Sequence, residues 1–345
     1  MRFGAFAPQG WRLDLVGQGD GHSQYLKMRE VALRLERLGY DSVWLYDHFH
    51  TIPEARPEAT FEVWTSMAAL AEATTTIRLG QMCCCNIYRP PALLAKMTSV
   101  IDVISNGRLE VGLGAGWYEH ECVAYGYPFE KPSVRIGQLD EACQILRGMW
   151  SQDAFQFQGK HYTIGHGRVK DYSGREVPLE GAINHPKPIQ SPHPPLWVAG
   201  GGEQLTLRTV ARYADYANFG GSVQQVARKN EILDRHCEAE GRDPAAIRRS
   251  MNCNIFLGDQ AHFKRLLEAT GRTAEQIASV QAMLSPSEPQ ALIESLAEYR
   301  EKARIDDILA YFADAATGDS IEAFAAEVMP ALGSKPESLP DLGRG

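Results

Sequence analysis

Eight short apolar runs alternate with helical patterns along nearly the whole chain, and this alternation constrains the fold more than any other feature. Between the runs, apolar side chains recur every three or four residues, as they do on one face of a helix. Strands that alternate with helices pair in parallel, and eight of them favour a closed barrel over an open sheet. The sequence therefore predicts an α/β fold, a (β/α)8 TIM barrel. The predicted strands cover residues 3–7, 42–46, 77–82, 108–114, 195–201, 215–219, 247–257 and 306–312.

The chain length of 345 residues is compatible with one such barrel, so a second domain is not required. We assign residues 1–335 to a single barrel domain with insertion segments at its C-terminal mouth, near 151–192 and 258–287. Residues 336–345 form a predicted C-terminal tail. Because loops over a barrel mouth commonly set specificity, the segment 165–190 is interpreted either as part of a substrate lid or as a solvated hairpin.

Composition and charge argue against several classes of protein. With 44% hydrophobic and 23% charged residues, the chain has the composition of an ordinary globular protein. The net charge of −8 and the lack of a Lys/Arg cluster argue against nucleic acid as a partner. No apolar stretch approaches ~18 residues and the first residues lack a signal-peptide pattern, so we expect no membrane partner and a cytoplasmic location.

The seven cysteines do not indicate a disulfide framework, because their number is odd and none forms a CxxC pair. Three of them are consecutive, at 83–85. Adjacent residues of a strand point to opposite faces, so these three cannot close a tetrahedral metal site together. We therefore expect no metal.

Polar side chains follow the second apolar run, where Asp47 and His48 come directly after residues 42–46. In a TIM barrel the active site is built at the C-terminal ends of the strands. The pair is thus expected at the barrel mouth. The alternative from these residues alone is a loop-capping Asp47 beside an exposed His48.

Small residues and glycines follow the next three predicted strands. QMCCCN (81–86) would let a flat ligand lie against the backbone, although core packing explains buried cysteines equally well. Glycines permit close backbone approach, and N–H groups at a helix start can hold phosphate. AGGGE (199–203) is therefore the predicted phosphate site, whereas GAG (114–116) is read as a site of ring approach or as a simple turn. Trp117 in that turn either contacts a ligand or packs. A Rossmann GxGxxG pattern is absent from the first βα unit.

Together these strand ends resemble the luciferase-like superfamily of flavin and deazaflavin oxidoreductases, most closely its branch of coenzyme F420-dependent enzymes. The resemblance extends to about residue 257. It is carried by DHFH (47–50), YRPPALLAKM (88–97), GRLEVGLGAGWYEHE (107–121), RGMWSQDAFQFQGKHY (147–162) and HPPLWVAGGGEQLTLRTVARYAD (193–215).

The resemblance implies that the mouth holds an isoalloxazine-like ring, with the phosphate near strand five. It places His48 near the reactive ring carbon as a proton donor or acceptor, with Asp47 contacting the ring or orienting the imidazole. It also implies a non-prolyl cis peptide at Met82–Cys83 behind the ring. Sugar-phosphate dehydrogenases of the superfamily carry a catalytic Glu at the position of Trp117, so their substrate and acid do not carry over directly. His120 stands where those relatives use an Asn toward the ring.

The predicted function is a coenzyme F420-dependent oxidoreductase that transfers a hydride between the deazaflavin and a small organic substrate, with His48 as acid/base. The alternatives are an FMN-dependent monooxygenase that uses reduced flavin and oxygen, or a non-catalytic flavin-binding protein. A homodimer is usual in the superfamily. The predicted catalytic residues are His48 and Asp47. The predicted cofactor-binding residues are Asp47, Met82, Cys83, Cys85, Gly114, Gly116, Trp117, His120, Ala199, Gly200, Gly201 and Gly202.

Overall fold

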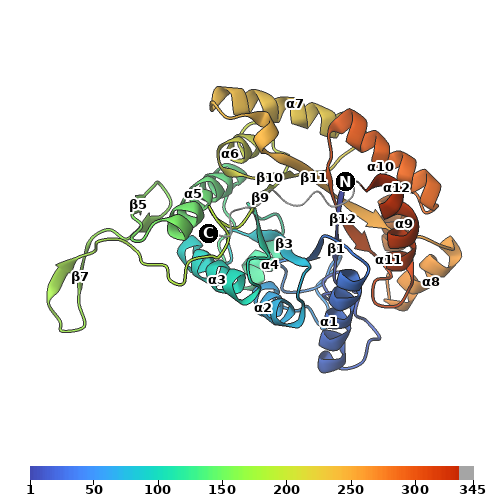
Figure 1. The fold of residues 1–345 in the computed structure, drawn as a ribbon. Coiled ribbons are helices and arrows are strands. Elements are labelled where there is room, and N and C mark those ends of the chain that lie inside the picture. Colours follow the sequence, from blue (N-terminus) through green and yellow to red (C-terminus); the bar gives the residue numbers. More distant parts are fainter. Residues whose placement is uncertain (334–345) are drawn as a thin grey trace.

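Eight parallel strands close into a barrel in the computed structural model, which describes residues 1–333 (Figure 1). This confirms the predicted (β/α)8 architecture, while the predicted tail 336–345 lies outside the described residues. Each predicted strand is present, with ends shifted by up to three residues. Around the barrel the strands are β1 (Arg2–Phe6), β12 (Asp307–Phe312), β11 (Arg248–Ile255), β10 (Tyr216–Asn218), β9 (Leu196–Ala199), β4 (Leu109–Gly114), β3 (Arg78–Cys85) and β2 (Ser42–Leu45).

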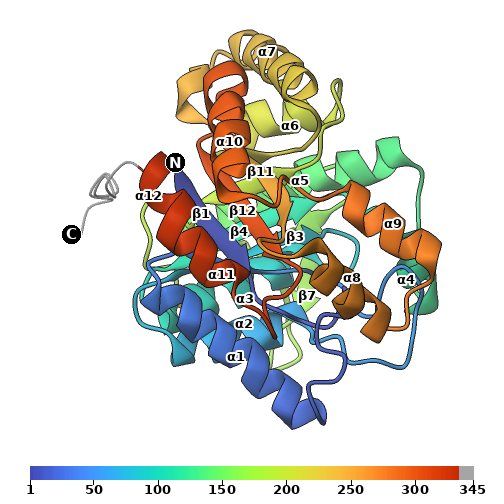
Figure 2. The same cartoon turned by 90° about the vertical axis from the view of Figure 1, so that its right-hand side faces the viewer.

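Helices surround the strands as an outer ring, and their apolar faces pack on the barrel (Figure 1). Figure 2 shows α4, α8 and α9 at the end of the barrel away from the N-terminus. No helix among residues 1–333 is both long and apolar enough to cross a membrane. The helices are α1 (Gly21–Arg37), α2 (Val63–Ala73), α3 (Pro91–Ile104), α4 (Glu119–Ala124), α5 (Pro132–Ser151), α6 (Thr206–Tyr213), α7 (Val223–Ala239), α8 (Gln260–Ala269), α9 (Ala274–Ala282), α10 (Pro289–Ala303), α11 (Ser320–Ala323) and α12 (Met329–Leu332), with a 3-10 turn at Pro244–Ala246 and a π turn at Phe324–Val328.

The barrel interior is filled by large aromatic side chains that face glycines on neighbouring strands. Trp44 on β2 is fully buried and meets Trp197 edge to face, with ring centroids 4.7 Å apart. A Cβ atom at Gly80, its partner on β3, would lie 2.4 Å from the Trp44 ring, and one at Gly4 on β1 would lie 2.4 Å from the indole nitrogen. The glycines therefore make room for the indole that fills this layer.

Charged side chains close the opposite end of the barrel, at the beginning of the strands. The buried Glu110 is paired with Arg78 and with Arg2, the latter at 3.2 Å. Asp307 is paired with Arg248 at 2.9 Å. Pairing is the condition under which such charges are tolerated in an interior. The open, ligand-accessible end is therefore the C-terminal one.

The two predicted insertions have different structures. The first contains two small antiparallel hairpins, β5 (Phe157–Gln158) with β6 (Thr163–Ile164), and β7 (Arg168–Lys170) with β8 (Glu176–Pro178). The second insertion, 258–287, forms α8 and α9. Figure 1 shows the β7 hairpin projecting sideways from the barrel beyond α3 and α5.

Candidate functional site

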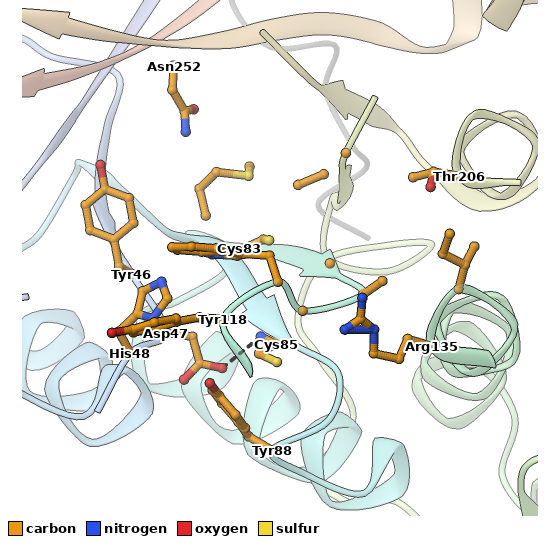
Figure 3. Close-up of a pocket in the computed structure, with 18 of the residues that line it drawn as sticks. Tyr46, Asp47, His48, Cys83, Cys85, Tyr88, Tyr118, Arg135, Thr206 and Asn252 are labelled. Carbon is orange, nitrogen blue, oxygen red and sulfur yellow. Dashed lines mark hydrogen bonds between the residues drawn. The ribbon is translucent and has the colours of Figure 1, made fainter. Parts of the chain in front are cut away.

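A cavity of about 490 Å³ opens at the C-terminal ends of the strands (Figure 3). Its walls come from the ends of β3, β4 and β9, from the segments after β1, β2, β3, β4 and β9, from Asn252 of β11 and from the first turns of α5 and α6. No residue of the segment 165–190 lines it, so the segment is not a lid in this structure. Residues 168–178 form the exposed β7–β8 hairpin, whereas Gln190 binds Arg78 and Asp102 at the closed end of the barrel. The predicted site residues that line the cavity are Asp47, His48, Met82, Cys83, Cys85, Gly114, Gly116, Trp117, Ala199 and Gly200.

The imidazole of His48 is held on one edge and stacked on one face. Its Nδ1 lies 2.8 Å from Oε2 of Glu121. Its ring is parallel to Trp11, with centroids 4.1 Å apart and an interplanar angle of 2°. Among residues 1–333, Nε2 has no hydrogen-bond partner and is not a fully buried atom, and His48 lines the cavity. The second ring nitrogen is therefore available to a ligand.

Glu121 on α4 is a site residue that the sequence did not single out. Its fully buried carboxylate accepts hydrogen bonds from the backbone N–H groups of Phe49 (2.6 Å) and His50 (3.1 Å) and from the Tyr88 hydroxyl (2.6 Å), besides that from His48. Burial opposes ionisation, but the bonds from His48, Tyr88 and Phe49 outweigh it and lower the pKa of Glu121. The residue therefore presents a fixed negative charge to the imidazole.

Asp47 occupies a different position from the one expected for an imidazole partner. Its carboxylate accepts two hydrogen bonds from the Arg89 guanidinium, at 2.7 and 3.1 Å, and one from the backbone N–H of Cys85 at 2.9 Å. Burial lowers the pKa of Arg89, but the attraction of nearby negative charge, chiefly that of Asp47, is stronger, and the pKa of Arg89 is raised overall. Of the two roles that the resemblance implied for Asp47, the contact with His48 is thus made by Glu121 instead, and contact with the ring stays a prediction. Asp47 fixes the end of β3 and still borders the cavity.

The end of β3 carries the cis peptide that the resemblance implied, between Met82 and Cys83. The pairing of β3 with β4 shifts register between Gln81 and Cys84 at the same place. Gly114 on β4 lies against this bulge, where an added Cβ would be 2.4 Å from the Cys83 sulfur. The bulge and Gly114 form one wall of the cavity, with backbone where a larger side chain would intrude.

The glycine run after β9 is only partly at the cavity. Ala199 and Gly200 line it, and Gly200 has a φ of +126°, a conformation that favours glycine. Gly201 and Gly202 do not line it, and a Cβ at Gly201 would lie 2.6 Å from the Lys229 amine. Thr206, the first residue of α6, also faces the cavity.

Two further predicted residues lie at the edge of the cavity or outside it. Trp117 lines the cavity edge with 63% of its surface exposed. His120 does not line the cavity: its exposed Nδ1 lies 3.4 Å from Nε2 of His50. His120 points away because α4 begins at Glu119 and turns its buried face, with Glu121, toward His48.

The chain belongs to the family described as luciferase-like monooxygenases, whose model matches residues 1–328. This confirms the resemblance seen in the sequence motifs. Curated relatives include an F420-dependent glucose-6-phosphate dehydrogenase of Amycolatopsis mediterranei, which is 31% identical over 46% of this chain and 47% of its own length. An FMNH2-dependent dimethylsulfone monooxygenase of Pseudomonas putida is 29% identical over 49% of this chain and 42% of its own. These alignments span about half of each relative or less.

A solved structure supports the fold. An F420-dependent secondary alcohol dehydrogenase, bound to an F420–acetone adduct, superposes with a TM-score of 0.77 at 19% identity. The superposition covers 96% of this chain and 99% of that chain. The shared feature at this identity is the architecture of the barrel.

Proposed function

We propose that the protein is a coenzyme F420-dependent oxidoreductase that transfers a hydride between the deazaflavin and a small organic substrate. One observation supports this most strongly: His48 lines the cavity and is held at Nδ1 by the buried Glu121, while its Nε2 has no hydrogen-bond partner among residues 1–333. The cavity volume of about 490 Å³ falls within the range of ~300–1,000 Å³ for ligand pockets. The wall formed by the Met82–Cys83 bulge and Gly114 suits a flat ring, which needs close backbone approach.

Protein groups at this site would handle the proton of the reaction. A bound deazaflavin would supply the hydride acceptor or donor. When a substrate carbinol carbon loses a hydride, its hydroxyl group must also lose a proton, which Nε2 of His48 accepts. In the reverse direction the imidazolium donates that proton to a carbonyl oxygen. Glu121 holds the proton on Nδ1 and stabilises the positive charge that the ring gains. Trp11 fixes the plane of the imidazole.

An FMN-dependent monooxygenase is the second candidate, because the Pseudomonas relative is an enzyme of that kind. Incubation of the purified protein with F420 or with FMN, followed by the absorbance of the bound fraction, separates the two. Binding of neither ring would contradict both. A homodimer, a cytoplasmic location and the absence of a nucleic-acid partner stay predictions.

Replacing His48 with Ala tests its role. We expect the variant to bind the cofactor about as tightly as the wild type, while turnover on a panel of small alcohols and carbonyl compounds falls by ~100-fold or more. The exposed His22, on α1, provides the matched control His22→Ala. A fully active His48→Ala variant would remove this residue from the mechanism.

A further inference from the structure

Arg135 is a buried cation without an anionic partner at the wall of the cavity. It lies in the first turn of α5, is 8% exposed, and lines the cavity. Its Nε and Nη1 atoms are buried and have no hydrogen-bond partner among residues 1–333. Arg89 and Arg78 differ, since Arg89 is paired with Asp47 and Arg78 with Glu110.

The surroundings of Arg135 hold its guanidinium in place without neutralising it. The carbon at the centre of this group lies 3.8 Å from the centroid of the Phe129 ring, a cation–π contact that covers one face. Ile136 is the next residue and also lines the cavity. A buried charge without a partner is costly in free energy, and a planar guanidinium matches the oxygens of phosphate or carboxylate. Nη2 of Arg135, which is not a fully buried atom and has no hydrogen-bond partner among residues 1–333, is the donor that an oxyanion in the cavity would meet.

Arg135 lies at the end of the cavity remote from the imidazole. Figure 3 shows Arg135 and Thr206 on one side, and His48 with Tyr46 on the other. Thr206 begins α6, whose N-cap residue makes no side-chain hydrogen bond to the helix. The two helix starts and Gly200 therefore border one polar end, while the reacting group stands at the opposite end.

We propose that Arg135 binds an oxyanion of the ligand that fills this cavity, and that this oxyanion is the phosphate on the side chain of the bound cofactor. The inference rests on the proposed function for the identity of the ring. It adds a phosphate-binding side chain on α5, outside the glycine run after β9 to which the sequence pointed.

The test compares FMN with riboflavin, which differ only by the phosphate, and F420 with its deazariboflavin, which lacks the phosphate and the acidic tail attached to it. Dissociation constants are measured by fluorescence titration for the wild type, Arg135→Met and Arg135→Lys. Methionine keeps an unbranched side chain over Phe129 but removes the charge. Lysine keeps the charge but lacks the planar arrangement of several N–H donors that a guanidinium has. We expect Arg135→Met to weaken binding of the phosphorylated form ~10- to 100-fold, which is about 1.4–2.7 kcal/mol. Binding of the dephosphorylated form should change less than ~2-fold, and Arg135→Lys should lie between.

The controls separate this inference from the proposed function. Arg168→Met, on the exposed β7 hairpin, should leave all affinities unchanged. If Arg135→Met weakened binding of the phosphorylated and dephosphorylated rings equally, or of neither, the assignment of Arg135 would be overturned. The proposed function would still stand, provided that the wild-type protein binds the ring. A loss confined to anionic substrates, with cofactor affinities unchanged, would place the oxyanion on the substrate and overturn the cofactor assignment. A wild-type protein that binds no ring contradicts the proposed function itself.

Discussion

Replacing Glu121 with Gln removes one buried negative charge while keeping the size of the side chain. In the wild type, Oε1 accepts hydrogen bonds from the N–H groups of Phe49 and His50, and Oε2 accepts them from His48 Nδ1 and the Tyr88 hydroxyl. Hydrogen bonds to a charged group contribute ~1.5–3 kcal/mol each and neutral ones ~0.5–1.5 kcal/mol. Replacing four hydrogen bonds to a charged group with four neutral ones would therefore cost ~4–6 kcal/mol in total.

Relief of the cost of burying a charge offsets part of this loss, so we expect the free energy of unfolding to fall by about 2–4 kcal/mol at pH 7. Because the folded state lowers the pKa of Glu121 below 4.5, its contribution is present above that pH and is lost as the pH falls. The difference between variant and wild type should accordingly shrink below pH ~4.5. The Gln amide group can only donate to Nδ1 of His48, so the proton of the neutral imidazole should move to Nε2.

Urea denaturation followed by circular dichroism measures the free energy of unfolding, and nitrogen NMR of labelled histidine reports the tautomer of His48. Glu119→Gln is the matched control, because Glu119 is exposed on the same helix. It should change stability by less than ~0.5 kcal/mol. The reasoning is refuted if Glu121→Gln unfolds like this control and its His48 keeps the proton on Nδ1.

Two further substitutions test the scaffold. Glu36 on α1 accepts hydrogen bonds from the successive N–H groups of residues 75–77 at 2.6–3.0 Å, which outweigh its partial burial and lower its pKa to about 2. Glu36→Gln should cost ~1–2 kcal/mol at pH 7 after allowance for solvent screening, and this difference should vanish as the pH falls from ~4.5 toward ~2. Gly80→Ala should destabilise by ~1–3 kcal/mol or more in urea, because the new methyl group meets the Trp44 ring.

Matched controls exist for both scaffold substitutions. Glu72 is exposed on α2, and Glu72→Gln should leave both the stability and its pH dependence unchanged. An added Cβ at Gly21 would meet nothing within 4 Å, so Gly21→Ala should be neutral or slightly stabilising. Equal effects of each substitution and its control would contradict the contacts described.

The strand ends at which the sequence placed the site do converge in the structure. Asp47, His48 and Gly114 were predictable because each follows an apolar run, and parallel strands bring their C-terminal ends to one rim. Three predicted residues lie outside the cavity wall: His120, Gly201 and Gly202. The residue pattern predicts where a strand ends, but it does not predict which residues of the following turn face the cavity.

The sequence analysis did not identify the site residues whose role depends on long-range contacts. Glu121 meets His48 across 73 positions of the chain, on a helix of six residues that is too short for a periodic signal. The acid in GWYEHE, just past the glycine-rich strand end, was the available hint. Arg135 reads as an ordinary charged residue near a helix start, and only folding places it against the cavity.

The sequence by itself determined the eight strands, most of the helices and the end of the barrel that carries polar groups, because hydrophobic periodicity is a local property of the chain. Tertiary structure alone decided which carboxylate meets the imidazole. Asp47 is adjacent to His48 in the chain, yet it pairs with Arg89, whereas the distant Glu121 takes the contact. Side chains buried at a closed barrel rim must find partners in space, and sequence neighbours there point in different directions.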